Sequence, residues 1–171
     1  DLLIVGTGTD TRPYPGEQTK LLIQTADGRL ADESATRLPQ RSSFTHNVAV
    51  GDIDGDGDFD IYMANVFGGD SGPRFYLNNG TGFFTEANDR LPSDIANRTP
   101  GSVHTASLLL DLTGDGKPEI VSVNNGNFGY ASPDWKNLTA KWTFTPISVG
   151  GTWQRYTHGL GVGDMNGDGR L

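Results

Sequence analysis

The sequence predicts an all-β fold built from a repeated unit, and two observations lead to that prediction. An acidic motif that begins at Asp52 returns at Asp111 and at Asp164, at intervals of 59 and then 53 residues. The segments on either side of its first copy, 47–50 and 59–64, are short, rich in β-branched or aromatic residues, and bounded by Gly and Asn, which is typical of hairpin strands. A repeat of this length indicates blades, coils or arrays.

The first acidic loop, residues 52–60, carries five carboxylates in nine residues. Carboxylates this close together repel by roughly 1 kcal/mol per pair even in water, so a folded loop needs a cation among them. Carboxylates at loop positions 1, 3, 5 and 9 and a backbone carbonyl at position 7 form an all-oxygen shell that suits Ca²⁺ better than Mg²⁺. Gly55 and Gly57 permit the positive φ that wraps the loop round an ion. The predicted ligands are Asp52, Asp54, Asp56, Asp58 and Asp60.

The other two loops repeat this pattern with substitutions. The second, residues 111–119, has Thr at position 3 and Glu at position 9, and we therefore expect it to bind more weakly. The third, residues 164–171, extends to position 8. Together the three loops predict two to three Ca²⁺ ions. The predicted ligands are Asp111, Thr113, Asp115, Lys117 and Glu119 in the second loop and Asp164, Asn166, Asp168 and Arg170 in the third, with Lys117 and Arg170 at the carbonyl position.

Asp1 is predicted to belong to the same pattern. Residues 1–5 align with 60–64, so Asp1 takes the ninth position of a metal loop, and Leu171 followed by Asp1 would regenerate a complete loop. The approximate repeats are 1–51, 52–110 and 111–163, with 164–171 starting a further one. Two interpretations follow: the chain is a piece of a longer tandem array, or Asp1 completes the third loop in trans within an oligomer.

The loops resemble one known family and differ from another. An EF-hand needs a bidentate Glu at position 12 between two helices, but position 12 is Met63 in the first loop and Ser122 in the second. The Asp-x-Asp-Gly-Asp-Gly-x-x-Asp pattern between strands, with the 75–85 segment after it, resembles the FG-GAP/VCBS repeats of integrin α-chain propellers and many secreted bacterial proteins. The resemblance covers essentially the whole chain. It implies that each repeat is one four-stranded blade of a β-propeller, and that the loops bind Ca²⁺.

Three blades are fewer than the roughly four to eight of a typical closed propeller, and an unclosed propeller leaves strand edges bare. We therefore expect about three four-stranded blades that are part of a larger propeller or are completed by oligomerisation. The expected partners are further blades of the same protein or a second copy of it.

The segments between the loops predict the remaining elements in order. After a turn-rich connector at 8–17, residues 20–25 predict a strand, Asp27-Gly28 a turn and 29–33 the edge strand of a blade. The second repeat follows the same order at 75–78, 80–82 and 83–87, and Leu-Pro closes both blades at 38–39 and 91–92. In the third repeat 120–125 predict a strand, 126–135 a different connector, and 141–147 the edge strand.

The three histidines provide the candidate catalytic residues. His46 and His158 lie six residues before the first Asp of a loop, and His104 lies seven before. In a propeller this strand is the innermost, so the side chains would start near the axis, at the face opposite the Ca²⁺ loops. They could bind a transition metal or act as acid and base, or simply hydrogen-bond a neighbouring blade. Arg155 and Tyr156 could join a polar central site beside His158.

Composition excludes several classes of function. The net charge of −8 argues against nucleic-acid binding, and no apolar run is long enough to span a membrane. The chain has no Cys, so disulfides and a thiol nucleophile are excluded. It also has no Gly-x-Ser-x-Gly elbow and no Gly-rich phosphate loop.

Two functions remain, and the sequence leaves open whether the chain is an enzyme. The resemblance favours a Ca²⁺-stiffened binding or scaffold module for carbohydrate or protein ligands. The alternative is the propeller domain of a polysaccharide lyase or sugar dehydratase with a His-containing central site. Weak sites with dissociation constants of roughly 10⁻⁴ to 10⁻³ M fill only outside the cell, which predicts a secreted or cell-surface protein whose partner is a glycan or an extracellular protein.

Overall fold

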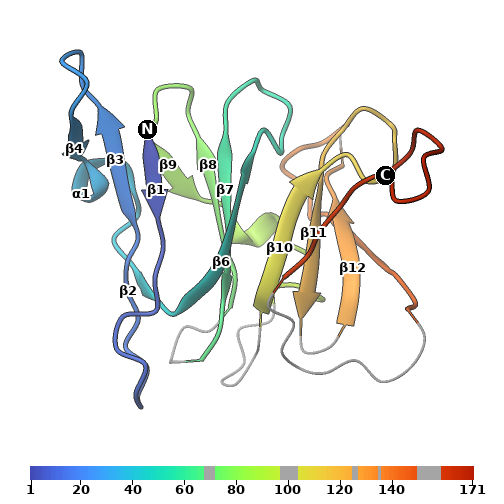
Figure 1. Cartoon of the computed structure of the whole chain (residues 1–171), viewed down its shortest axis with the longest axis horizontal. Coiled ribbons are helices and arrows are strands. Elements are labelled where there is room, and N and C mark those ends of the chain that lie inside the picture. Colours follow the sequence, from blue (N-terminus) through green and yellow to red (C-terminus); the bar gives the residue numbers. More distant parts are fainter. Residues whose placement is uncertain (68–71, 97–103, 125–126, 135, 150–158) are drawn as a thin grey trace.

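The computed structural model describes residues 1–67, 72–96, 104–124, 127–134, 136–149 and 159–171. In these ranges the chain forms four antiparallel sheets (Figure 1). We call the three larger ones the first, second and third sheets in chain order, and the two-stranded one the small sheet. The all-β class is therefore confirmed. No described helix is long and apolar enough to cross a membrane.

The second sheet shows why the acidic motif sits where it does. Its strands β6 (Thr45–Gly51), β7 (Asp60–Asn65), β8 (Arg74–Asn78) and β9 (Phe84–Glu86) lie side by side in chain order. Every residue of β7 is buried, as expected for a central strand of apolar and small residues. Gly51 pairs with Asp60, so the first acidic loop is the turn of the β6–β7 hairpin, as predicted.

The third sheet corrects one prediction. Its strands are β10 (His104–Leu110), β11 (Glu119–Asn124), β12 (Asn127–Ser132) and β13 (Thr143–Pro146), again in chain order. The 126–135 segment, expected as a connector, contains β12. Its Gly129 looked like a loop residue, but a Cβ there would lie 2.4 Å from the Phe144 ring, so the neighbouring strand requires glycine.

The first sheet has three described strands where four were expected. It consists of β1 (Leu2–Ile4), β3 (Lys20–Gln24) and β4 (Leu30–Asp32) in the order β1-β3-β4. The small sheet pairs β2 (Glu17–Gln18) with β5 (Ser42–Ser43) and was not predicted, because two-residue strands have no sequence pattern.

Two short helical turns extend the internal repeat. The helix α1 (Ser34–Arg37) precedes Leu38-Pro39, and the 3₁₀ helix η1 (Asn88–Arg90) precedes Leu91-Pro92. Each turn ends at the Arg before the Leu, and the Leu itself is extended, since the residue before a proline is disfavoured in helical geometry. The sequence showed the Leu-Pro endings but not the turns themselves.

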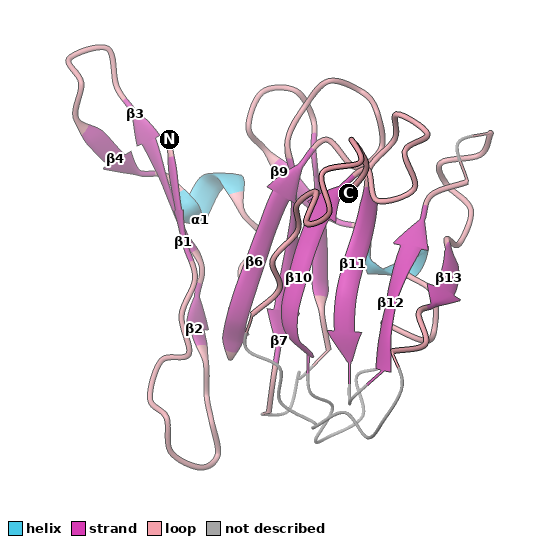
Figure 2. Ribbon diagram, turned by 45° about the vertical axis from the view of Figure 1, so that its right-hand side comes forward, coloured by secondary structure: helices cyan, strands magenta, loops and turns pink. Residues whose placement is uncertain are grey.

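Two apolar clusters hold the three larger sheets together. Between the second and third sheets, Phe75 and Trp142 meet edge to face with ring centroids 5.0 Å apart. Between the first and second sheets, Leu21 and Leu38 pack with Ile61, Met63 and Tyr76. Figure 2 shows the strands β6 and β10 side by side, where the Asn47 Oδ1 accepts hydrogen bonds from the Ser107 N–H at 3.0 Å and its hydroxyl at 2.8 Å.

Arg37 links the first and second sheets. Its Nε lies 2.5 Å from the Glu33 carboxylate, its Nη1 donates to the Thr81 carbonyl at 2.6 Å, and its guanidinium lies 4.6 Å from the centre of the Phe83 ring. Arg37→Ala should lower the free energy of unfolding by about 1–2 kcal/mol in urea titrations. The matched control is Arg29→Ala, whose side chain is 86% exposed. Equal effects of the two variants would contradict this account of Arg37.

Asp32 provides a pH-dependent contribution to stability. Hydrogen bonds from the Ser34 hydroxyl first, then from Lys20 and the Ser34 N–H, lower the pKa of Asp32 from 3.8 to about 2. Because the folded-state pKa lies below the unfolded value, this contribution is present above about pH 4 and is lost as the pH falls through about 2. Carboxyl NMR titration should show Asp32 still ionised at pH 3, and Asp32→Asn should flatten the stability profile in that window. A titration midpoint near 4 would contradict the prediction.

Candidate metal centre

The first loop is shaped by its own first aspartate. The Asp52 Oδ1 accepts hydrogen bonds from the N–H groups of Gly55 at 2.7 Å and Asp56 at 3.1 Å, and its Oδ2 accepts one from Gly57 at 3.0 Å. Gly55 and Gly57 have φ of 79° and 96°, which confirms the predicted need for glycine at both positions. The loop is thus held in its curved form by side chain and backbone together.

The second and third loops repeat this geometry closely. Asp111 accepts from Gly114, Asp115 and Gly116 at 2.7, 3.1 and 2.8 Å. Asp164 accepts from Gly167, Asp168 and Gly169 at 2.6, 3.1 and 2.7 Å. All three loops lie at the same end of the sheets (Figure 1). The three acidic loops therefore share one backbone conformation.

Three carboxylates converge in the first loop. Asp52, Asp54 and Asp60 each offer an oxygen, and these oxygens lie within 4.8 Å of one another. Asp60 is completely buried, with its Oδ1 accepting from the Asn78 N–H at 2.9 Å and its Oδ2 from the Ile53 N–H at 3.1 Å. Burial raises the pKa of Asp60 to about 7 despite these two hydrogen bonds. A divalent cation nearby would favour its charged form.

Asp54 provides a more direct test of whether a cation fits. Its Oδ1 is buried and has no hydrogen-bond partner among the described residues, while its Oδ2 lies 3.7 Å from the Arg90 Nη1. Burial, and then the charge of Asp56, raise the pKa of Asp54 against the opposing effect of Arg90. A buried carboxylate oxygen without a partner, next to two further carboxylates, fits a hard cation.

The second loop reaches a similar arrangement with a longer side chain. Asp111, Asp115 and Glu119 bring oxygens within 4.8 Å of one another. The Glu119 Oε2 accepts from the Leu112 N–H at 2.9 Å, the position equivalent to Ile53, and its Oε1 accepts from the Thr113 hydroxyl at 3.3 Å. Burial raises the pKa of Glu119 as it does that of Asp60. These residues also fit a hard cation.

Asp115 belongs to the converging carboxylates of the second loop, whereas its equivalent Asp56 is not among those of the first loop. Asp56 and Asp115 each accept a hydrogen bond at 3.0 Å from the N–H two residues on, that of Asp58 and Lys117 respectively, the residues predicted to contribute carbonyls.

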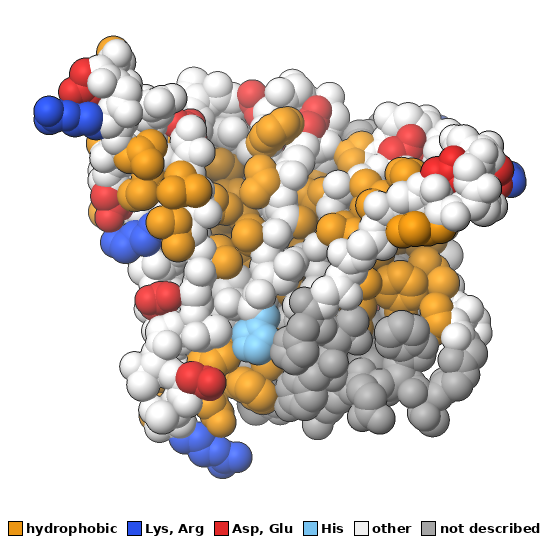
Figure 3. All heavy atoms as spheres, viewed as in Figure 1, with side chains coloured by type: hydrophobic (Ala, Val, Ile, Leu, Met, Phe, Trp, Pro, Cys, Tyr) orange, Lys and Arg blue, Asp and Glu red, His pale blue; other side chains and the backbone are white. Residues whose placement is uncertain are grey.

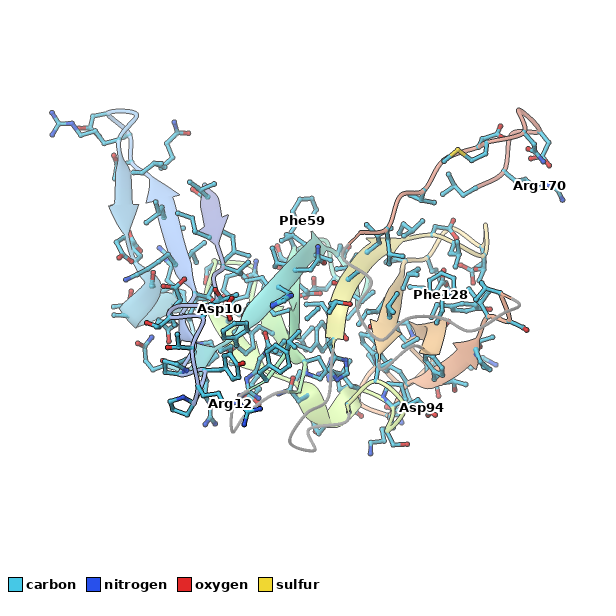
Figure 4. All side chains as sticks on the ribbon, turned by 60° about the horizontal axis from the view of Figure 1, so that its bottom comes forward. Asp10, Arg12, Phe59, Asp94, Phe128 and Arg170 are labelled. Carbon is cyan, nitrogen blue, oxygen red and sulfur yellow. The ribbon has the colours of Figure 1, made fainter. Side chains whose placement is uncertain are left out.

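The third loop is exposed and differs in charge. Asp168 pairs with Arg170 at 2.8 Å and accepts a hydrogen bond from the Asn166 side chain at 3.1 Å. Arg170 therefore neutralises a carboxylate that a cation would otherwise use. Figure 4 shows Arg170 and Phe59, on the third and first loops, projecting from the same side of the molecule.

Asp1 accepts a hydrogen bond like one that Asp60 accepts, and its predicted role as a metal ligand stays a prediction. Its Oδ1 accepts from the Gln24 N–H at 2.8 Å, as the Asp60 Oδ1 accepts from the Asn78 N–H at 2.9 Å. Both acceptors stand at the start of a strand and both donors at the end of its antiparallel neighbour.

Two of the five candidate catalytic residues lie in the described ranges. His104 is completely buried at the start of β10, and the half-buried His46 lies with its ring 5.5 Å from that of Phe44. His158, Arg155 and Tyr156 fall outside the described residues.

Two residues of the first site were not predicted from the sequence. Arg90 reaches Asp54 from η1, and no local pattern links positions so far apart. Asn78 provides the N–H to Asp60, donates its side-chain amide to the Phe59 carbonyl at 3.2 Å, and accepts from the Gly82 N–H at 2.9 Å. The Asn-Asn-Gly run that starts at Asn78 was the one available signal, and it indicated only a turn.

The fold and the loops define an all-β repeat protein with acidic clusters in hairpin turns that could hold a metal. A family model for the FG-GAP-like repeat matches residues 1–63 and 111–171. Because these matches cover more than half of the chain, it belongs to the FG-GAP-like repeat family. Repeats of this family often bind calcium and are typical of extracellular or cell-surface proteins. No curated protein matches the chain.

Proposed function

We propose that this chain is a calcium-binding β-propeller module that works outside the cell or at its surface, as a binding or scaffold platform for a carbohydrate or protein ligand. The observation that carries the proposal is the first loop, where the carboxylates of Asp52, Asp54 and the buried Asp60 converge and the buried Asp54 Oδ1 has no hydrogen-bond partner among the described residues. The loops that begin at Asp111 and Asp164 have the same backbone conformation as the first loop. The proposed number of bound ions is therefore two to three.

The ion's role is structural. It would be held by Asp52, Asp54, Asp56 and Asp60, with the Asp58 carbonyl, and it would join the β6–β7 turn to the end of β8 through Asp60 and Asn78. Binding to the folded state alone stabilises a protein by about 2.7 kcal/mol when the ligand is at 100 times its dissociation constant. With dissociation constants of roughly 10⁻⁴ to 10⁻³ M, millimolar extracellular calcium would supply about 0.4–1.4 kcal/mol per site, and resting cytosol almost none.

The burial of His104 favours binding over catalysis by this residue. A catalytic acid or base must reach the substrate, and His104 is completely buried in β10. The rigid loops at one end of the sheets are better suited to displaying side chains to a partner.

Calcium titration by isothermal calorimetry tests this proposal. We expect saturable binding of two to three ions to the chelator-treated chain, and weaker binding of Mg²⁺. Asp52→Ala should remove the tightest site, and Asp10→Ala, an exposed aspartate outside the loops, should leave the isotherm unchanged. If Asp111→Ala removed the tightest site as Asp52→Ala does, the prediction that the first loop binds more tightly than the second would be wrong. If no calcium bound at millimolar concentration, the proposed function would be wrong.

A further inference from the structure

Arg90 brings a positive charge to the first acidic loop. It is the last residue of η1, and its Nη1 lies 3.7 Å from the Asp54 Oδ2. The two side chains are only 20% and 13% exposed. Charges that are shielded from water in this way interact more strongly than charges at an exposed surface. The charge of Arg90 therefore acts on any cation that binds to Asp54.

Arg90 and Asp54 form an ion pair without a hydrogen bond. Their separation of 3.7 Å is longer than the roughly 2.7–3.2 Å of an N–H···O hydrogen bond. Neither the Arg90 Nη1 nor the Asp54 Oδ1 has a hydrogen-bond partner among the described residues, although both atoms are buried. Arg90 thus offsets the charge of Asp54 without occupying its oxygens. These oxygens remain available as ligands, but a cation bound to them would lie beside a positive charge.

The guanidinium of Arg90 extends from an anchored stretch of backbone. The Arg90 N–H donates to the Ala87 carbonyl at 3.1 Å, and the Arg90 carbonyl accepts from the backbone N–H of Trp142 at 2.8 Å. Trp142 is buried, and its ring contacts that of Phe75 in the cluster between the second and third sheets. The charge therefore reaches the loop from a fixed point in the fold and not from a free surface side chain.

The loop that Arg90 contacts is the most acidic of the three. The first loop has five carboxylates, whereas the second, residues 111–119, has three and also contains Lys117. In the second loop Thr113 takes the position of Asp54. Figure 3 shows acidic side chains recurring along the edge of the molecule that carries the loops. Arg90 therefore lies where repulsion between carboxylates is greatest as long as no ion is bound.

We propose that Arg90 is the counter-ion of the first metal site: it offsets the charge of Asp54 while no ion is bound, and it opposes the calcium ion when one binds. This inference rests on the proposed calcium-binding function and deepens it. A group that stabilises the ion-free state and destabilises the bound state lowers the affinity of the site. Arg90 therefore keeps the first site weaker than its five carboxylates alone would make it.

Calcium titrations of Arg90→Gln and Arg90→Lys by calorimetry test this role. Gln removes the charge but keeps a polar side chain, so the tightest calcium site should bind roughly threefold to tenfold more tightly than in the parent chain. Lys keeps the charge, so the affinity should stay close to that of the parent. The control is Arg29→Gln, which removes the same charge from a side chain that is 86% exposed and outside the acidic loops. It should leave the affinity unchanged.

Melting temperatures in chelator test the same role without any metal. Arg90→Gln should lower the melting temperature, because it leaves the Asp54 carboxylate without its counter-ion. Adding Asp54→Asn to Arg90→Gln should restore much of this loss, and it should raise the melting temperature more than Asp54→Asn does in the parent chain. Equal effects of Asp54→Asn in the two chains would show that Arg90 and Asp54 are not coupled, which would overturn the proposal.

The direction of the change in calcium affinity separates a counter-ion from a residue that only holds the loop in shape. Weaker or unchanged binding by Arg90→Gln would overturn the proposal, since loss of a purely structural contact does not tighten a site. An equal gain in affinity in Arg29→Gln or in Arg90→Lys would also overturn it. If the parent chain binds no calcium, the proposed function itself fails. If the parent binds calcium and Arg90→Gln binds it no more tightly, only this inference fails.

Discussion

Phe75→Ala should lower the free energy of unfolding by about 3–5 kcal/mol, because it opens a cavity where the second and third sheets meet. Phe75 is completely buried, and its ring contacts Trp142 edge to face at 5.0 Å. The backbone N–H of Trp142 also donates to the Arg90 carbonyl at 2.8 Å, which joins η1 to the residue before β13. Urea unfolding followed by tryptophan fluorescence measures the effect.

The matched control is Phe59→Ala, since Phe59 is 65% exposed in the first loop. We expect it to change stability by no more than about 0.5 kcal/mol. Similar losses from the two variants would show that the contact between the sheets is not the main source of the effect at Phe75.

Asp60→Asn should abolish the part of the calcium-dependent stabilisation that comes from the first loop. The amide keeps the shape of the side chain but removes its charge, and it places a donor opposite the N–H of Ile53 or Asn78, which costs about 1–3 kcal/mol by itself. Two quantities must therefore be separated: the melting temperature in chelator and its increase on adding calcium. The variant should lower both.

Asp10→Asn is the control, because Asp10 is exposed and lies outside the acidic loops. It should leave the melting temperature and the calcium-dependent increase as they are in the parent chain. A full calcium response in Asp60→Asn would mean that the first loop does not hold the ion through its buried carboxylate.

The sequence predicted the parts of the fold that depend on interactions between residues close together in the chain. The glycines at 55 and 57 are needed because the Asp52 carboxylate draws three consecutive N–H groups inward, and that requirement is visible in the sequence. The hairpin strands on both sides follow from their β-branched and aromatic residues. The same reasoning predicted that Asp1 takes the ninth position of a loop, and this stays a prediction.

The features that the sequence did not predict depend on contacts between residues far apart in the chain. The strand β12 was missed because Gly129 is required by the approach of Phe144, and the sequence gives no sign of that neighbour. The small sheet depends on Glu17 meeting Ser43 across 26 residues. Arg90, at the end of η1, reaches Asp54 across a long stretch of chain, so this basic side chain of the site was not predicted.

The most direct test of the central claim is a crystal structure of the chain grown in millimolar calcium. The account predicts an ion between the carboxylates of Asp52, Asp54 and Asp60, with all ligands oxygen at 2.3–2.6 Å, and a weaker one at Asp111, Asp115 and Glu119. A well-ordered first loop that holds only water at those carboxylates would contradict it.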